Sequence, residues 1–200
     1  MPRNDLLSKD EQKRFDTPPQ FTNAQNEYFF KLPIELQERL NTFDNDTSKV
    51  AFILLYGYFR ATYIFFKLDS APVKDIDFIK KMYSLHYETN TSPSVRTLRR
   101  HKVLIKEYLG IRAYDESIHL NLTKEAENHV GNFLHQKKIF YALVDAAKNL
   151  RIEVPSYTQL SRIISDAQNL HKHEVLNKLS AFMQDDCLQI LRSEEHTSEL

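Results

Sequence analysis

Residues 50–66 read VAFILLYGYFRATYIFF, and no other stretch of the chain comes closer to a membrane-spanning segment. The run has 17 residues, which is the lower edge of the spanning range, and it carries Arg60 in its interior. An arginine near the centre of a bilayer costs a few kcal/mol. We therefore interpret 50–66 as a buried helix of a globular protein, and we expect no membrane partner.

Apolar residues recur at spacings of three and four on both sides of this run, which is the period of a helix. No β-hairpin signal interrupts them. The chain has only three glycines, Gly57, Gly110 and Gly131, so it cannot contain a glycine-rich phosphate loop or a dinucleotide fingerprint. With 200 residues, of which 42% are hydrophobic, it can bury a sizeable core. These observations predict an all-α fold and exclude Rossmann and P-loop enzymes.

Caps and prolines divide the chain into candidate helices. Ser8 and Glu11 have the spacing of a capping box at the start of a short helix. We expect 115–121 to form a loop, and 152–155 to form a short extended connector because the residue before a proline avoids the α region. Further helices are predicted over 34–43, 50–66, 75–86, 95–109, 123–150, 157–170 and 175–183.

The net charge is zero, from 27 basic and 27 acidic residues, but the basic residues are concentrated in one segment. Residues 80–112 hold eight Lys or Arg against two Asp or Glu, whereas 1–48 and 113–191 are acidic. Affinity for nucleic acid depends on such a local patch and not on the average over the chain. The segment 80–112 is therefore the candidate contact surface.

The predicted helix 95–109 is amphipathic when its residues are placed about 100° apart. Leu98, Ile105 and their apolar neighbours fall on one arc, and the remaining arc is basic. Lys80 and Lys81 join this patch if helix 75–86 packs against helix 95–109 as an antiparallel or helix-turn-helix pair. The candidate DNA-binding residues are Arg96, Arg99, Arg100, Lys102, Lys106, Arg112, Lys80 and Lys81.

An ordinary solvated helix face is the alternative interpretation of these cations, and composition alone does not separate the two. Exposed helices usually mix the signs of charge to gain i,i+4 pairs. Between Arg96 and Arg112, however, Glu107 is the only acid among six cations. This scarcity of acids favours phosphate contacts, and an arginine fork can also reach guanine in the major groove.

No catalytic, metal or cofactor site emerges from the remaining polar residues. His171 and His173 are at positions i and i+2, which point apart on a helix. The pair 185–186 of aspartates beside Cys187 has no partner base. We therefore expect no metal and no cofactor. A single cysteine fits a reducing compartment, and residues 1–5 lack the apolar region of a secretory signal, so we expect a cytoplasmic location.

Several segments occur in an order that resembles the N-terminal region of Tn-three-family replicative transposases, over most of residues 1–183. The most specific of them is the arginine-rich helix that ends in Tyr108-Leu109-Gly110-Ile111-Arg112. The segments are Met1-Pro2-Arg3 with Leu6-Leu7-Ser8, the run SKVAFILL at 48–55, TLRRH at 97–101 followed by IKEYLGIR at 105–112, and IEVPS at 152–156.

The resemblance implies a helical region that binds double-stranded DNA at the terminal inverted repeats of a transposon. It places catalysis in a far-downstream domain, so the present chain is not expected to be an enzyme that cuts or joins DNA. It also implies that the full-length protein is a homo-oligomer that pairs transposon ends, and that it associates with the bacterial nucleoid when bound to DNA.

We expect a compact DNA-binding domain over 1–113 and a second helical unit over 114–191, with truncation of the second unit left open. Residues 192–200 resemble one reading frame of a sequencing-adapter oligonucleotide, and we assign them no function. A different class remains open, namely a helical protein-interaction module whose basic face binds an acidic partner. Competition by DNA of defined sequence separates this alternative from DNA binding.

Overall fold

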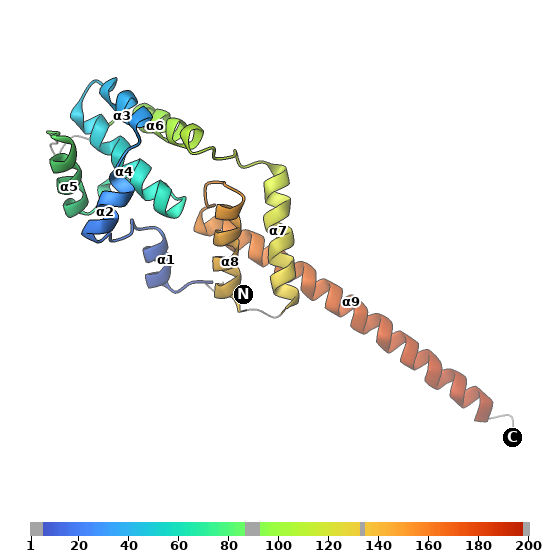
Figure 1. The fold of residues 1–200 in the computed structure, drawn as a ribbon. Coiled ribbons are helices and arrows are strands. Elements are labelled where there is room, and N and C mark those ends of the chain that lie inside the picture. Colours follow the sequence, from blue (N-terminus) through green and yellow to red (C-terminus); the bar gives the residue numbers. More distant parts are fainter. Residues whose placement is uncertain (1–5, 87–92, 133–134, 198–200) are drawn as a thin grey trace.

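The computed structural model describes residues 6–86, 93–132 and 135–197, and these ranges are built from helices (Figure 1). The only β feature within them is an isolated parallel bridge between Arg112 and Ile152. The predicted all-α fold is therefore confirmed. The elements are α1 (Lys9–Phe15), α2 (Asn23–Phe30), α3 (Ile34–Asn41), α4 (Asp46–Thr62), the short 3-10 helix η1 (Leu68–Ser70), α5 (Val73–Tyr83), α6 (Val95–Tyr108), α7 (Glu116–Gly131), α8 (Gln136–Asn149) and α9 (Tyr157–Thr197).

Helix α4 is the centre of the first hydrophobic core. Its residues from Val50 to Phe59 are buried, because α2, α5 and α6 pack around it. Gly57 allows α2 to come close, since a Cβ at this position would lie 2.2 Å from Cδ1 of Phe30. The apolar stretch 50–66 is thus the core helix that its sequence predicts.

Helix α4 ends earlier than its apolar stretch. Tyr63 adopts a left-handed backbone conformation with a φ of 61°, which stops the helix at Thr62 instead of the predicted Phe66. The Thr62 hydroxyl then accepts a hydrogen bond from the Ile64 N–H at 3.1 Å. Within the described part of the chain, no helix combines the length and the apolar character needed to cross a membrane.

The second hydrophobic core lies between α7, α8 and α9, and the N-terminal segment belongs to it. Leu6 and Leu7 are buried in this core, and the ring of Phe15 in α1 lies 5.1 Å from that of Phe140 in α8. The expected domain over 1–113 therefore needs correction at its N-terminal end, because this segment packs with the second unit and not with the first.

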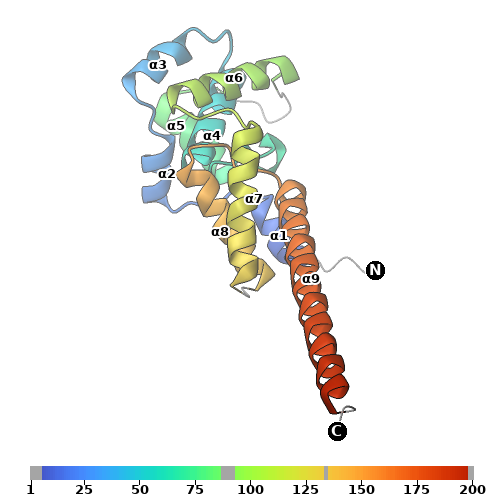
Figure 2. The same cartoon turned by 90° about the vertical axis from the view of Figure 1, so that its right-hand side faces the viewer.

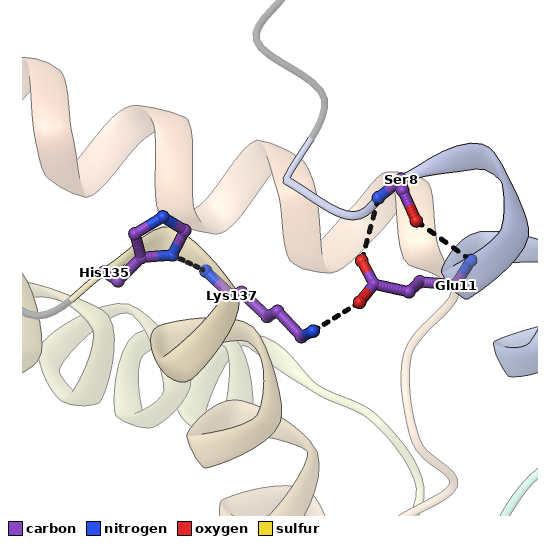
Figure 3. A network of polar contacts seen from close by, with 4 residues as sticks. All are labelled: Ser8, Glu11, His135 and Lys137. Atoms are coloured by element: carbon purple, nitrogen blue, oxygen red, sulfur yellow. Dashed lines mark hydrogen bonds and ion pairs between the residues drawn. The ribbon is translucent and has the colours of Figure 1, made fainter.

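A network of hydrogen bonds and an ion pair connects α1 to α8 (Figure 3). The Ser8 hydroxyl accepts from the Glu11 N–H at 3.3 Å, and the Glu11 carboxylate accepts from the Ser8 N–H at 3.0 Å, which confirms the predicted capping box. The other carboxylate oxygen of Glu11 accepts from Lys137 Nζ. The Lys137 ammonium and the Ser8 N–H together lower the pKa of Glu11 to about 2.

The segment 115–150 differs from its predicted structure. Helix α7 occupies most of the expected loop, because the Asp115 carboxylate caps it by accepting from the Ile118 N–H at 2.9 Å. The predicted helix over 123–150 is divided between α7 and α8, and His135 caps the second of them. Both helices face the same core, so the apolar spacing of one runs on into the other. The spacing therefore gives no sign that one helix ends and another begins.

Helix α9 is one continuous helix where the spacing predicted two. One face of it, from Leu160 to Ala167, is buried in the second core, but Leu170 is 52% exposed and Leu179 is 53% exposed. Figures 1 and 2 show the helix projecting away from the rest of the molecule. The core contribution of α9 therefore ends at Ala167.

Backbone hydrogen bonds join the two units beside the connector between α8 and α9. The Arg112 N–H donates to the Arg151 carbonyl at 2.8 Å, and the Val154 N–H donates to the Tyr63 carbonyl at 2.9 Å. The C-terminal end of α6 thus lies next to residues 151–154, and this position decides the surroundings of its last cations.

Candidate nucleic-acid interface

Helix α6 forms where the sequence predicts it, and its ends have clear causes. The Ser94 hydroxyl caps the first turn by accepting from the Thr97 N–H at 3.1 Å. Gly110, with a φ of 63°, adopts the left-handed conformation that follows many helices. His101 and Ile105 are its buried residues and face α4. The opposite side of the helix carries the predicted cations.

The first cations of α6 are exposed to solvent. Arg96, Arg99 and Arg100 are all exposed to solvent, and within the described ranges none of their guanidinium groups has an acidic partner. All three line a groove of about 620 Å³ between α6 and α3, and the opposite side of this groove includes Arg39. Figure 2 shows α3 and α6 side by side at one end of the molecule.

The later cations of α6 have partners inside the protein. Lys102 and Lys106 are half-buried, and their ammonium groups lie 5.2 Å and 5.8 Å from the centre of the Phe65 ring. Lys106 also forms an ion pair with Glu153 at 2.5 Å. The structure therefore does not bring all five cations of the predicted arc to one surface: three line the groove, and two face Phe65.

Arg112 lies beyond the end of α6, on the segment that leads to α7. Its side chain is exposed, and its backbone N–H is used in the hydrogen bond to Arg151. Arg112 is not among the residues that line the groove between α3 and α6. It belongs to the junction of the two units.

Lys80 and Lys81 are on α5, and α5 does not pair with α6. Each of these two helices packs on α4, and the antiparallel or helix-turn-helix arrangement that would join the lysines to the patch is not formed. Lys80 is half-buried and Lys81 is exposed. The structure leaves both outside the groove, so we remove them from the candidate site.

His101 is a residue of this region that the sequence interpretation passed over. It is 2% exposed, its ring stacks on Phe43 at 4.7 Å, and its Nε2 lies 3.2 Å from the Ser48 hydroxyl. Burial, with a smaller contribution from the positive charge of Arg100, lowers its pKa to about 4. The sequence does carry a signal for this burial, because His101 falls about 140° from Arg96, inside the apolar arc of the helix.

Arg39 is the second residue that sequence reasoning missed. It is exposed on α3 and lines the same groove as the arginines of α6. No local pattern links it to them, because α3 and α6 are far apart in the sequence and meet only through their packing around the first core.

The chemistry available in this region is recognition of anions. Guanidinium forks bind phosphate and carboxylate groups through two parallel hydrogen bonds. Among the described residues, no group of three or more His, Cys, Asp or Glu side chains is placed to hold a metal ion.

A family model matches most of the chain. The family model described as "Domain of unknown function (DUF4158)" matches residues 6–167. No curated protein and no solved structure matches the chain. The matched range starts at Leu6 and ends at Ala167, which are the first and last buried residues of the second core, and it includes the whole of α6. The chain therefore belongs to the DUF4158 family.

Proposed function

We propose that this protein binds double-stranded DNA through the N-terminal half of α6, and that it recognises transposon terminal inverted repeats as the non-catalytic N-terminal part of a transposase. The observation that carries the proposal is the set of three exposed arginines, Arg96, Arg99 and Arg100, at one end of an amphipathic helix, with no acidic partner among the described residues. The transposon part of the proposal rests on the sequence resemblance.

The position of these arginines on the helix supports an anionic ligand. The first turn of a helix carries a partial positive charge from its free N–H groups, so a cation there is destabilising by about 0.3–1 kcal/mol. The first turn of α6 contains Arg96 and no acidic residue, and two more arginines follow in the second turn. A phosphate group relieves this repulsion, because both the helix end and the guanidinium groups attract it.

Double-stranded DNA fits this surface through two kinds of contact. Arginines that reach phosphates fix the position of the protein and release counterions. An arginine that reaches a base edge binds guanine O6 and N7, which supplies sequence preference. A helix presents both kinds of side chain at once when it lies in or across the major groove.

Titration of the purified chain against two labelled duplexes tests the proposal. One duplex carries the terminal inverted repeat that flanks the gene, and the other has the same composition in scrambled order. We expect tighter binding to the repeat, and weaker binding by the Arg99→Ala, Arg100→Ala double variant. Equal affinity of the wild-type chain for both duplexes would contradict recognition of the repeat.

A competition experiment separates DNA from an acidic protein partner, which is the alternative function class. Unlabelled repeat duplex or poly-glutamate is added to the preformed complex of the chain with labelled repeat duplex, and the two competitors are compared per unit of negative charge. We expect the duplex to compete at far lower concentration than poly-glutamate, because the guanidinium groups recognise phosphate geometry as well as charge. More effective competition by poly-glutamate would favour the interaction module.

A further inference from the structure

The groove between α3 and α6 brings together cations from two helices. Arg39 of α3 lies on one side, and Arg96, Arg99 and Arg100 of α6 lie on the other. Arg39 is exposed, and its guanidinium group has no acidic partner in the described part of the chain. Four arginines around one groove repel one another, and an anion between them removes that repulsion.

Among the described residues, Asp44 is the only acid that lines the groove. Its side chain is exposed, so a single carboxylate in water faces four guanidinium groups. The groove therefore keeps a net positive charge. A site of this sign favours an anion with more than one oxygen, because each guanidinium fork uses two.

Two stacked rings form part of the wall of the groove. Phe43 and His101 both line it, and their rings are stacked at an angle of 20° with centroids 4.7 Å apart. His101 is 2% exposed and its Nδ1 has no hydrogen-bond partner among the described residues. Because burial holds its pKa near 4, the ring is neutral at physiological pH and the positive charge of the groove comes from the arginines alone.

We propose that this groove holds a phosphate group of the DNA backbone between Arg39 and the arginines of α6. The inference rests on the proposed function and adds to it a second helix and a new contact residue. A strand held at this point crosses α3 as well as α6, so Arg39 fixes the orientation of α6 on the duplex. Phosphate contacts of this kind set the position of a protein and carry no sequence preference themselves.

Substitution of Arg39 tests the proposal, with two comparison variants. Arg39→Gln removes the predicted contact, Lys124→Gln removes one exposed charge from α7 in the second unit, and Asp44→Asn removes the acid from the groove. We expect Arg39→Gln to weaken binding about fivefold or more for the repeat and the scrambled duplex alike, and to reduce the log–log salt slope by about one. Lys124→Gln should change neither quantity, and Asp44→Asn should tighten binding to both duplexes.

The outcomes separate this inference from the proposed function. If the wild-type chain binds the repeat and Arg39→Gln matches Lys124→Gln in affinity and salt slope, the groove contact is wrong and DNA binding by α6 stands. If the wild-type chain binds neither duplex, both proposals fail together. Loss of binding confined to the repeat would also overturn the inference, because it would make Arg39 a base-reading residue. Circular dichroism and the thermal midpoint of Arg39→Gln should match those of the wild type, since the side chain is exposed.

Discussion

The two halves of α6 carry cations on the same helical arc but place them in different surroundings. In the first half, Arg96, Arg99 and Arg100 are exposed around a groove and have no acidic partner in the described chain. In the second half, Lys102 and Lys106 lie beside the Phe65 ring, and Lys106 is paired with Glu153. Periodicity assigns all five to one surface, and tertiary packing divides them into three that line the groove and two that have partners inside the protein.

The division follows from what each half packs beside. The second half runs along the loop after α4 and the connector before α9. The Phe65 ring of that loop and the Glu153 carboxylate of that connector contact its lysines. The first half runs beside α3, which offers another arginine, Arg39, in place of an acid. A basic helix face is therefore better judged by the residues opposite it than by its own sequence.

Removing the cations of each half separately has the largest expected effect. The triple variant Arg96→Gln, Arg99→Gln, Arg100→Gln should bind the repeat duplex about a thousandfold more weakly or worse, because each of the three charged hydrogen bonds contributes about 1.5 kcal/mol or more. The double variant Lys102→Gln, Lys106→Gln should lose about threefold or less, from the change in overall charge. Fluorescence anisotropy at one salt concentration measures both. Equal losses in the two variants would remove the distinction between the halves.

His101, which lies between the two halves, should make stability depend on pH. Its pKa is about 4 in the folded chain and 6.5 in the unfolded chain, so the unfolded state takes up the proton first as pH falls. The contribution of the neutral His101 ring to the free energy of unfolding is fully present above pH 6.5 and is lost as the pH falls towards 4. We expect a loss of about 2 kcal/mol between pH 7 and pH 5, measured by urea unfolding.

The variant His101→Phe should flatten this pH profile, because phenylalanine can stack on Phe43 and has no proton to bind. His173→Gln, on the exposed part of α9, is the matched control and should leave the profile unchanged. The carboxyl groups of Glu11 and Asp46 have lowered pKa values and contribute only at more acidic pH. A profile that persists in His101→Phe would show that another group is responsible.

The ion pair between Lys106 and Glu153 should have a small effect on stability and none on DNA affinity. Both side chains are more than a third exposed, at 37% and 39%, so solvent screens the pair and we expect about 0.2–1 kcal/mol from a double-mutant cycle. Glu153→Gln releases Lys106 without changing the arginines. Tighter DNA binding by Glu153→Gln would show that Lys106 contacts phosphate when it is free.

Shortening α9 should have the smallest effect. The second core ends at Ala167, and the side chains from 172 to 183 are exposed. A chain ending at residue 172 should keep both the thermal midpoint and the DNA affinity of the full chain. A large fall in affinity would place part of the DNA contact on α9 and weaken the assignment of the site to α6.

The sequence predicts the fold class and the position of α6 well, because both depend on local signals. Apolar spacing defines the helices, Ser94 and Gly110 mark the ends of α6, and the Ser8 capping box is formed as expected. The break between α7 and α8 was missed because both helices face one core and the apolar period continues through it.

The candidate site was only partly predictable, because its boundaries depend on contacts between distant segments. Arg39 meets the arginines of α6 only after α3 and α6 have packed in the first core. Phe65 and Glu153, which contact Lys102 and Lys106, come from two further segments. No spacing within residues 80–112 carries this information.

We propose that the arginines of the first half of α6 contact DNA and that the lysines of the second half do not. Chemical modification with mass spectrometry tests it directly, using phenylglyoxal for arginine and acetic anhydride for lysine, with and without the repeat duplex. We predict that DNA protects Arg96, Arg99 and Arg100, while Lys102 and Lys106 react to the same extent in both samples. Protection of the two lysines without protection of the three arginines would place the DNA on the second half of α6 and overturn the proposed site.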